Sequence, residues 1–429
     1  HPREPFETGR QLFKSPFYER EVALGGYFME AAGWERAHGY AANEQTLLVK
    51  YRDQIPQRMN EWDSRHFWEV SNAEQLALSD DVGMVNLSHF AIYDIDGQSA
   101  EPLLEYLAVA KVGGATQVGK GVYTHFLDEK GGIRADLTIV RLSEDCFRVI
   151  CGGGTGHRDL VWIKQMAAAR HADIEIHNRT HQLATLGLWG PNARKVLASL
   201  VDDPNTVSDA KFPFATAANI EIAGINIWAF RISYVGELGW ELYFDFADGL
   251  QLWDLFADAG VNPVGIETYA NSRRLEKSLR LQNADLETDY NLHEADLARK
   301  LVKKADFHGK AAYVAQKAAD QQASYLCTMV MLKNVDASGV ARYPVGEWPI
   351  LNKETREVLL DELGRRSICT SVEYGPSLGS NIILGYIPAE FASVGTELLL
   401  EYFCEEYPIR IEAVGYAPLL DPENLRVRS

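Results

Sequence analysis

Apolar and polar positions along the chain predict a mixture of helices and strands. Over residues 19–34 the apolar residues recur at roughly helical spacing, which predicts a helix, although Gly25 and Gly26 weaken the pattern. Near residue 80 the pattern changes to short apolar runs, and 82–87 with 91–97 predict a hairpin pair. The chain is therefore expected to open with a helix and to continue into a body that contains strands.

The middle of the chain interleaves further helices and strands, each supported by a helical face or a short β-rich run. Helices are expected over 101–112, 159–169, 249–259 and 265–281 and after Pro191, and strands over 120–127, 134–142, 146–152 and 173–177. From about residue 323 to 418 the pattern is strand-rich, with prolines and glycines between the runs. This part predicts a small β-barrel or sandwich that follows a mixed body.

Within the run 232–243, Tyr234 and Glu241 lie seven residues apart on either side of two glycines. The glycines predict a hairpin or loop between strands, which can bring the phenol and the carboxylate back towards one pocket. Such a pair suits a planar heteroaromatic ring such as a pterin, because the phenol forms an aromatic wall and the carboxylate accepts paired N–H groups. The alternative is a surface hairpin in which Glu241 is solvated.

A second hairpin is predicted around Gly131-Gly132, and Asp136 stands at the start of its apolar second strand. A carboxylate that is buried there without a partner would cost free energy or take up a proton at neutral pH. The alternative is an ordinary ion pair with Arg134 or Arg141 at the edge of the sheet. Asp136 is therefore a candidate functional residue.

Other motifs give weaker signals. The glycine-rich run 151–157 follows a strand but matches neither a dinucleotide fingerprint nor a phosphate loop. His177 and His181 are four residues apart, but a strand-like context precedes them, so no metal site is expected. The sequence contains no HExxH motif.

Charge and composition narrow the function classes. Acidic residues number 60 against 42 basic ones, a formal net charge of −18, which argues against binding to nucleic acid or to an anionic membrane. An anionic small ligand would need local cations. The chain has no apolar run of about 18 residues, so no membrane span is expected.

Five cysteines, an odd number without a CxxC pair, predict a reducing compartment: the cytoplasm, or the mitochondrial matrix if the source is eukaryotic. The chain begins at His1 without a methionine. Either a leader or tag has been removed, or the chain is the C-terminal part of a longer polypeptide.

Several segments in order along the chain carry a family resemblance: 86–90, 123–136, 159–163, 190–193, 234–241, 274–277 and 306–310. Together they resemble the folate-dependent aminomethyltransferase family, whose type member is the T-protein of the glycine cleavage system. The likeness covers about residues 45–420. The lead-in, 13–17 and 32–36, is most similar to the folate-binding C-terminal half of dimethylglycine and sarcosine dehydrogenases.

The resemblance implies an α+β fold with a three-part body around a central folate channel and a C-terminal β-barrel. The expected divisions are a helical lead-in (1–44), a folate-binding body of two subdomains (45–324) and the barrel (325–429). Tetrahydrofolate is the implied cofactor. The implied catalytic carboxylate is Asp136, and the implied cofactor-binding residues are Tyr123, Tyr234, Glu241 and Arg274.

The implied reaction moves a one-carbon unit from a small N-methylated amine, or its iminium, to tetrahydrofolate. An FAD-dependent dehydrogenase domain or subunit is the implied partner. Direct methyl transfer from an N-, O- or S-methyl donor, giving methyl-tetrahydrofolate, and a non-catalytic folate-binding module are the alternatives. Departures from the family pattern, such as Gly152 where the T-protein commonly has Asn and Leu281-Gln282-Asn283, leave the donor open.

Overall fold

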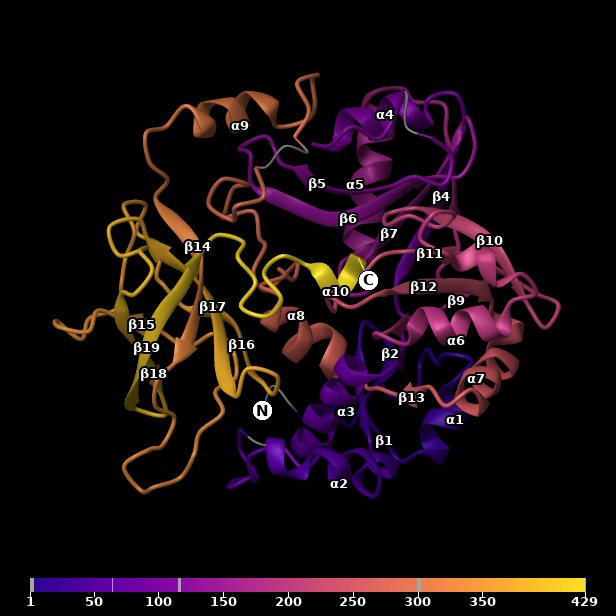
Figure 1. The fold of residues 1–429 in the computed structure, drawn as a ribbon. Helices are drawn as coiled ribbons and strands as arrows, with labels where there is room; N and C mark the ends of the chain where they lie inside the picture. The colour runs from indigo at the N-terminus through magenta and orange to yellow at the C-terminus, as the bar shows by residue number, and fades with distance from the viewer. Residues whose placement is uncertain (1–3, 64, 115–116, 299–301, 429) are drawn as a thin grey trace.

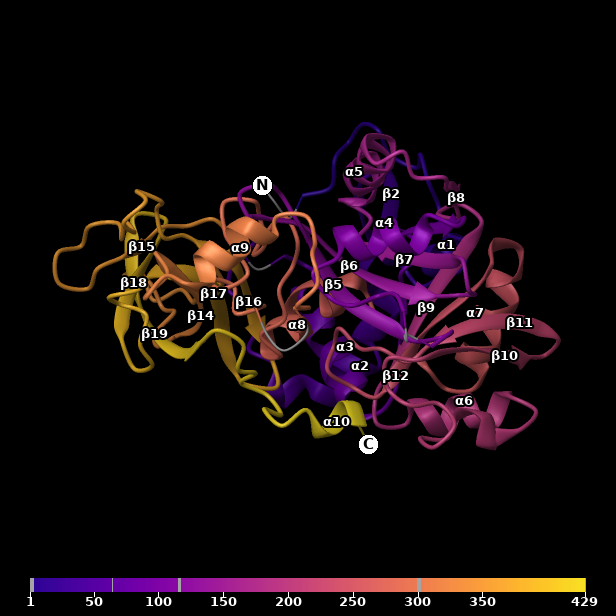
Figure 2. The ribbon, with the colours of Figure 1, turned by 90° about the horizontal axis from the view of Figure 1, so that it is seen from above.

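The structure, a computed structural model, describes residues 4–63, 65–114, 117–298 and 302–428. In this part of the chain two β-sheets and their helices form a body, and a third sheet stands beside it (Figures 1 and 2). None of the helices in these ranges is both long and apolar enough to cross a membrane.

The first sheet of the body is antiparallel and has helices on its outer face. In spatial order its strands are β5 (Gly121–Leu127), β6 (Ile133–Arg141), β7 (Cys146–Cys151), β4 (Ala91–Asp96) and β8 (Glu175–Asn178). Helices α4 (Ala100–Leu107) and α5 (Gly156–Ala169) pack against it through apolar residues such as Leu104 and Ile163. The predicted helices and strands of this region are confirmed, within a few residues at their ends.

The second sheet has its own helical layer. Its strands, in spatial order, are β10 (Ala217–Ile222), β11 (Ile225–Phe230), β12 (Gly239–Asp245), β9 (Leu183–Trp189), β3 (Gly83–Asn86) and β13 (Asn262–Pro263). Helices α6 (Ala193–Leu200) and α7 (Gly249–Asp258) share its outer core, and so do Phe17 and Leu24, which flank α1 (Tyr18–Ala23). The predicted helices after Pro191 and over 249–259 are confirmed.

The inner faces of these two sheets pack on each other. Val140 and Ile150 of the first sheet share one apolar cluster with Trp189, Phe230 and Tyr243 of the second. Because side chains alternate along a strand, every second residue of the facing strands enters this interior. Polar residues at those positions are therefore withdrawn from bulk water.

The N-terminal segment differs from the prediction. The helix predicted over 19–34 is wrong, because α1 ends at Ala23 and a hairpin of β1 (Gly26–Ala31) and β2 (Trp34–Tyr40) follows. Gly25 and Gly33 have φ angles of +68° and +84°, which glycine adopts readily and which break the helix and turn the hairpin. Helices α2 (Leu47–Tyr51) and α3 (Trp68–Asp80) follow.

The predicted pairing of 82–87 with 91–97 is also wrong. Both runs form strands, but β3 pairs with β9 in the second sheet and β4 pairs with β7 in the first. The chain crosses between the sheets at Leu87, whose backbone N–H donates to the carbonyl of Thr185. The pattern of apolar residues within a strand does not predict which strand it pairs with. The partner depends on strands that lie far away in the sequence.

The C-terminal part is a curled antiparallel sheet, as the strand-rich pattern predicts. Its order is β15 (Ile350–Leu351), β18 (Glu397–Tyr402), β19 (Glu405–Val414), β14 (Ser324–Met331), β17 (Ser380–Pro388) and β16 (Cys369–Gly375). Helix α9 (Lys310–Lys317) precedes it. The α+β class is therefore confirmed. The divisions at residues 44 and 324 stay a prediction, since apolar clusters join residues on both sides of each.

A short helical segment lies where the body meets the third sheet. A π-helical turn, Thr268–Ser272, runs into α8 (Arg273–Glu276), so the helix predicted over 265–281 is confirmed only in part. The chain end returns to this point, and α10 (Leu425–Arg428) lies across the middle of the molecule (Figure 1).

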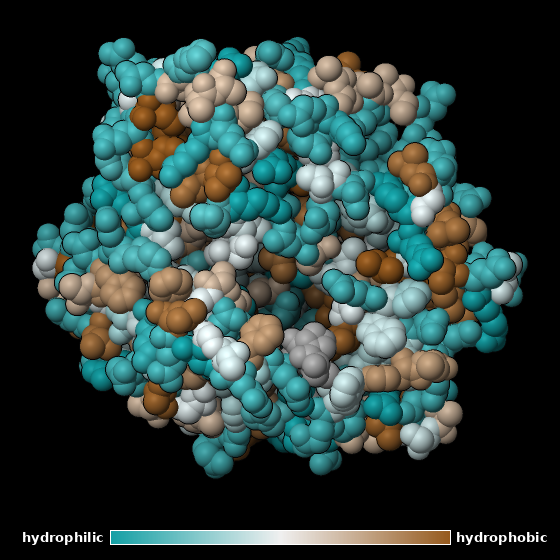
Figure 3. All heavy atoms as spheres, turned by 180° about the vertical axis from the view of Figure 1, so that it is seen from behind, coloured by the Kyte–Doolittle hydropathy of each residue, from teal (hydrophilic) through white to brown (hydrophobic). Residues whose placement is uncertain are grey.

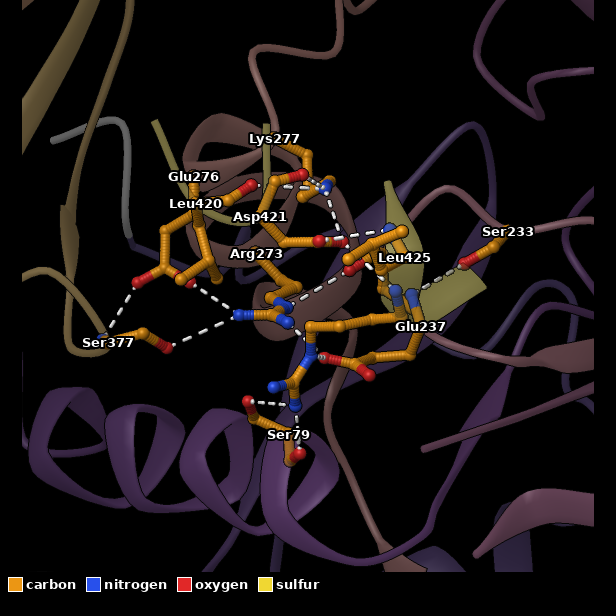
Figure 4. A network of polar contacts seen from close by, with 12 residues as sticks. Ser79, Ser233, Glu237, Arg273, Glu276, Lys277, Ser377, Leu420, Asp421 and Leu425 are labelled. Carbon is orange, nitrogen blue, oxygen red and sulfur yellow. Dashed lines mark hydrogen bonds and ion pairs between the residues drawn. The ribbon is translucent and has the colours of Figure 1, made fainter. Parts of the chain in front are cut away.

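The chain end and α8 hold the loop that carries Tyr234 through buried charges (Figure 4). Arg273 forms ion pairs with Glu237 of that loop and, at 2.8 Å, with Glu276, and its Nε donates to the carbonyl of Val235 at 3.0 Å. Arg426 adds a second cation at 2.7 Å from Glu237 Oε1. Cations from α8 and from the C-terminal segment thus hold the loop in place.

Loss of the Arg273 charge should destabilise the protein strongly. Arg273→Met leaves Glu237 and Glu276 buried with less compensation, and breaking a buried pair in this way costs about 3–5 kcal/mol. Unfolding in urea measures the free energy. Arg52→Met is the matched control, because Arg52 is 40% exposed in its ion pair with Glu69, and exposed pairs are worth about 0–1 kcal/mol. An equally small loss for both variants would contradict the structural role of Arg273.

Candidate functional site

The alternation along β6 turns Asp136 into the space between the two sheets. Its neighbours Ala135 and Leu137 belong to the outer core under α4 and α5, so Asp136 points the other way. On the adjacent strand β5, His125 is directly opposite Asp136, and Tyr123 lies two residues further along on the same face. Asp136, His125 and Tyr123 thus form one polar group on the inner face of the first sheet.

No lysine or arginine of the described residues forms an ion pair with Asp136. Burial raises the pKa of Asp136 to about 7, the nearby charge of Asp159 raises it further, and the Tyr123 hydroxyl lowers it. The Nε2 atom of His125 lies 3.6 Å from Asp136 Oδ1, but burial and the charge of Arg280 lower the His125 pKa to about 3, so this ring is neutral. Asp136 Oδ1 is buried and accepts no hydrogen bond within the described ranges.

The ion pair considered as an ordinary explanation for Asp136 is absent from the part of the chain that the structure describes. Arg141 pairs instead with Glu101, and Arg134 places its guanidinium 4.2 Å from the centre of the Trp162 ring. The interpretation of Asp136 as a buried, functional carboxyl is therefore the one that the geometry favours.

Glu241 enters the same interior from the second sheet. Its neighbours on β12, Trp240 and Leu242, belong to the helix-covered core, so Glu241 and Tyr243 point inward. Glu241 Oε2 accepts a hydrogen bond of 2.5 Å from the Tyr243 hydroxyl, and burial raises the pKa of Glu241 to about 7. No hydrogen bond from the described residues reaches its Oε1 atom, which is left to accept from a ligand.

Tyr269, on the π-helical turn, connects these groups. Its ring centre lies 5.1 Å from that of Tyr234 and 5.5 Å from that of Trp189. Burial raises the pKa of Tyr269, and the nearby groups Glu241, Tyr234 and Asp136 act in the same direction. Two carboxyls and two phenols from both sheets and the connecting turn therefore gather at one place. Sequence reasoning missed Tyr269, although its position before the Arg274 motif was a usable signal.

Tyr123 and Tyr234 differ in how they are held. The Tyr234 hydroxyl donates to the carbonyl of Arg280 at 2.6 Å, which fixes its ring. Tyr123 is 39% exposed although Asp136, Tyr234 and Arg280 lie close enough to shift its pKa. The Tyr123 side chain is therefore partly accessible to solvent, although its hydroxyl lies 3.2 Å from His125 Nε2. Figure 3 shows that one face of the molecule is hollowed near its middle.

The guanidinium of Arg274 is bonded to other groups of the protein. It forms a 2.6 Å ion pair with Asp285, donates to Ser371 Oγ at 2.7 Å, and its remaining hydrogen bonds go to the carbonyls of Ala270 and Leu279. This geometry gives it a supporting position between the body and the third sheet. The charge of Arg274 still acts on Tyr234, and Arg280, which sequence reasoning missed, acts on Tyr123, His125 and Tyr234.

An open cleft of about 360 Å³ lies beside Tyr243, the residue whose hydroxyl donates to Glu241. That cleft is lined by residues such as Arg148, Trp228 and Tyr243 and by none of the five predicted site residues. Asp136 and Glu241, the two carboxyls whose pKa values burial raises, therefore stay the candidate site residues.

The residues around Tyr269 fit a planar ring with N–H donors along one edge. The free oxygen of Glu241 can accept such donors, and Tyr234 and Tyr269 supply aromatic surfaces for the ring. The unpartnered Oδ1 of Asp136 can accept from a protonated or cationic nitrogen. A reduced pterin has these features, so the donor and acceptor set suits tetrahydrofolate.

Comparisons with known proteins agree with this fold. The family model described as the GCVT N-terminal domain matches residues 17–305, and the glycine cleavage T-protein C-terminal barrel domain matches residues 346–414. The crystal structure of glycine cleavage system aminomethyltransferase T from Bartonella henselae has a similar fold, with a TM-score of 0.76 at 21% identity, covering 96% of this chain and 99% of that chain.

The curated relatives are longer than this chain. Mitochondrial dimethylglycine dehydrogenase of Rattus norvegicus is 32% identical over 438 residues, which cover 100% of this chain and 47% of the relative. The Homo sapiens enzyme of the same name is 32% identical over 418 residues, 95% of this chain and 44% of the relative. The chain thus spans about half the length of these relatives. The matches over both parts of the chain show that it belongs to the glycine cleavage T-protein (GCVT) family.

Proposed function

We propose that this protein transfers a one-carbon unit from an N-methylated amine, in its oxidised iminium form, to tetrahydrofolate. The observation that carries the proposal is Asp136, a mostly buried carboxyl that has no neutralising lysine or arginine among the described residues and that shares one interior with Glu241 and two tyrosines. Family membership and the fit of this interior to a pterin support the choice of tetrahydrofolate.

Each residue has a physical role in this proposal. Glu241 holds the pterin edge by accepting its N–H groups, and Tyr234, Tyr269 and Tyr123 border the ring. Tetrahydrofolate, when bound, supplies the nucleophilic nitrogens that take up the carbon. Ionised Asp136 would stabilise the positive charge of the iminium and accept a proton that the folate nitrogens release. The carbon–nitrogen bond of the former iminium breaks, and the demethylated amine leaves with a proton. We give Arg274 a supporting position through Asp285 and Ser371.

The iminium must come from an oxidation that precedes the transfer. Similar proteins are named dimethylglycine dehydrogenases and are about twice as long as this chain. We therefore propose that an FAD-dependent dehydrogenase domain or subunit removes two electrons and a proton from the amine and delivers the iminium here. The names of these relatives place them in mitochondria, and the location of this protein stays a prediction.

The folate product tests the reaction class. With an N-methylated amine, its flavin-dependent dehydrogenase and tetrahydrofolate, mass spectrometry should find methylene-tetrahydrofolate, because the carbon arrives at the oxidation level of formaldehyde. Methyl-tetrahydrofolate formed without the dehydrogenase would show direct methyl transfer instead and would refute the iminium route. A reaction without this protein measures the spontaneous condensation of formaldehyde with folate.

Asp136→Asn should lower turnover by about 10²-fold or more, the usual size for one acid–base or electrostatic group. Folate affinity, measured by isothermal titration, should change far less, because Glu241 and the tyrosines hold the pterin. Asp254→Asn is the control, since Asp254 is 45% exposed in its ion pair with Arg20. If Asp136→Asn keeps full turnover, the protein is a folate-binding module or uses another group.

The raised pKa of Asp136 predicts two dependences on pH. Because the ionised form acts, kcat/KM should rise as the pH increases through about 7, and this rise should persist in Glu241→Gln. A carboxyl whose folded pKa exceeds its unfolded value of 3.8 lowers stability as the pH rises from about 4 to about 7. Asp136→Asn should therefore raise Tm at pH 8 and not at pH 4. Equal Tm differences at both pH values would argue against the raised pKa.

A further inference from the structure

Arg36, on β2, is a cation without a counterion in direct contact. Its Nε atom is buried and without a hydrogen-bond partner, and no hydrogen bond or ion pair to its guanidinium occurs in the ranges the structure describes. Burial lowers the pKa of Arg36, while the more distant charges of Glu267 and Glu30 act against that change. Buried arginines are ordinarily paired, because an isolated buried charge is costly.

The two glutamates near Arg36 are engaged elsewhere. Glu267 accepts from His38 Nδ1 at 2.7 Å and from the Asn271 side chain at 2.8 Å, and Glu30 accepts from the backbone N–H of Gly33. Neither carboxylate therefore closes an ion pair with the guanidinium. A ligand could therefore form an ion pair with the Arg36 guanidinium without displacing a carboxylate of the described residues.

Two histidines surround the same space. His38 follows Arg36 by two residues on β2, both side chains are only partly buried, and the Nε2 atom of His38 is buried and has no hydrogen-bond partner among the described residues. His89 is close to both, since burial and then the charges of Arg36 and His38 lower its pKa. Arg36, His38 and His89 are thus neighbours, and Arg36 Nε and His38 Nε2 are the buried nitrogens in this group that lack a hydrogen-bond partner among the described residues.

This cluster of Arg36, His38 and His89 adjoins the folate site. The ring of Phe90, next to His89, lies 6.2 Å from that of Tyr269. Glu267, which holds His38, precedes Tyr269 by two residues at the start of the same π-helical turn. The cluster therefore lies about one side-chain layer beyond Tyr269.

We propose that Arg36, with His38 and His89, binds a carboxylate of a ligand of the folate site. The planar guanidinium matches a carboxylate with two parallel hydrogen bonds, and pairing would remove the cost of the isolated charge. It also supplies the local cation that an anionic ligand needs in a protein of net charge −18. The inference rests on the proposed function, and the carboxylate belongs either to an N-methylated amino acid or to the glutamyl group of folate.

Isothermal titration of Arg36→Gln separates the two sources. One pair of probes is N,N-dimethylglycine and its methyl ester, and the other is tetrahydrofolate and its glutamyl dimethyl ester, so that the members of each pair differ only in a free carboxylate. Loss of a charged hydrogen-bonded contact should weaken the carboxylate member of one pair about 10- to 100-fold and leave its partner unchanged. Arg36→Lys should recover part of the affinity, because lysine keeps the positive charge but cannot form the two parallel hydrogen bonds of a guanidinium.

Arg20→Gln is the matched control and should bind every probe as the parent does, because Arg20 is exposed in its pair with Asp254. Selective weakening for dimethylglycine assigns the amine donor, and selective weakening for tetrahydrofolate assigns the glutamyl group. No change in Arg36→Gln, or equal weakening of both members of a pair, overturns the inference. Binding is measured without turnover, so a failure of the catalytic role of Asp136 remains distinguishable.

Thermal unfolding of Arg36→Met gives a second test. A cation kept for a ligand costs stability in the free protein, so Tm should stay the same or rise. A carboxylate probe should then raise Tm for the parent and not for the variant. A fall in Tm of several degrees for Arg36→Met would show that Arg36 serves the fold and would overturn the inference.

Discussion

Exclusion of water between the two facing sheets is the constraint on which the chemistry of this protein depends. The apolar cluster that includes Val140, Phe230 and Tyr243 closes this space, and it leaves Asp136 and Glu241 with few groups to stabilise their charges. Both carboxyls have pKa values of about 7 for this reason. In water the same carboxyls would be ionised at neutral pH, and their interactions with other charges would be weak.

The buried arginines of the molecule show two different uses of charge. Arg273 and Arg274 are saturated by carboxylates and carbonyls, and they join the π-helical turn to the Tyr234 loop and to the third sheet. Arg36 has no such partners among the described residues, and it lies beside the site rather than between structural elements. Arg273 and Arg274 thus stabilise the fold through their ion pairs, whereas Arg36 is the arginine that we propose binds a ligand.

The features predicted correctly from sequence are those with local causes. The β5–β6 hairpin follows from its Gly-Gly turn and the Tyr234 loop from its two glycines, because such residues determine backbone direction over a few positions. The errors concern distant partners. Residues 19–34 looked helical because hairpin strands can show a similar apolar spacing, and β3 and β4 were paired although each has its neighbour in a different sheet.

The sequence alone determined that Asp136 stands in an apolar strand and that Tyr234 and Glu241 flank a turn, since these are properties of neighbouring residues. Only the tertiary structure decided that Tyr269 lies among them, that Arg274 is already bonded and that Arg36 is not. The reason is physical: desolvation and Coulomb interactions depend on distances in space, and β2, β6, β12 and the π-helical turn come from widely separated parts of the chain.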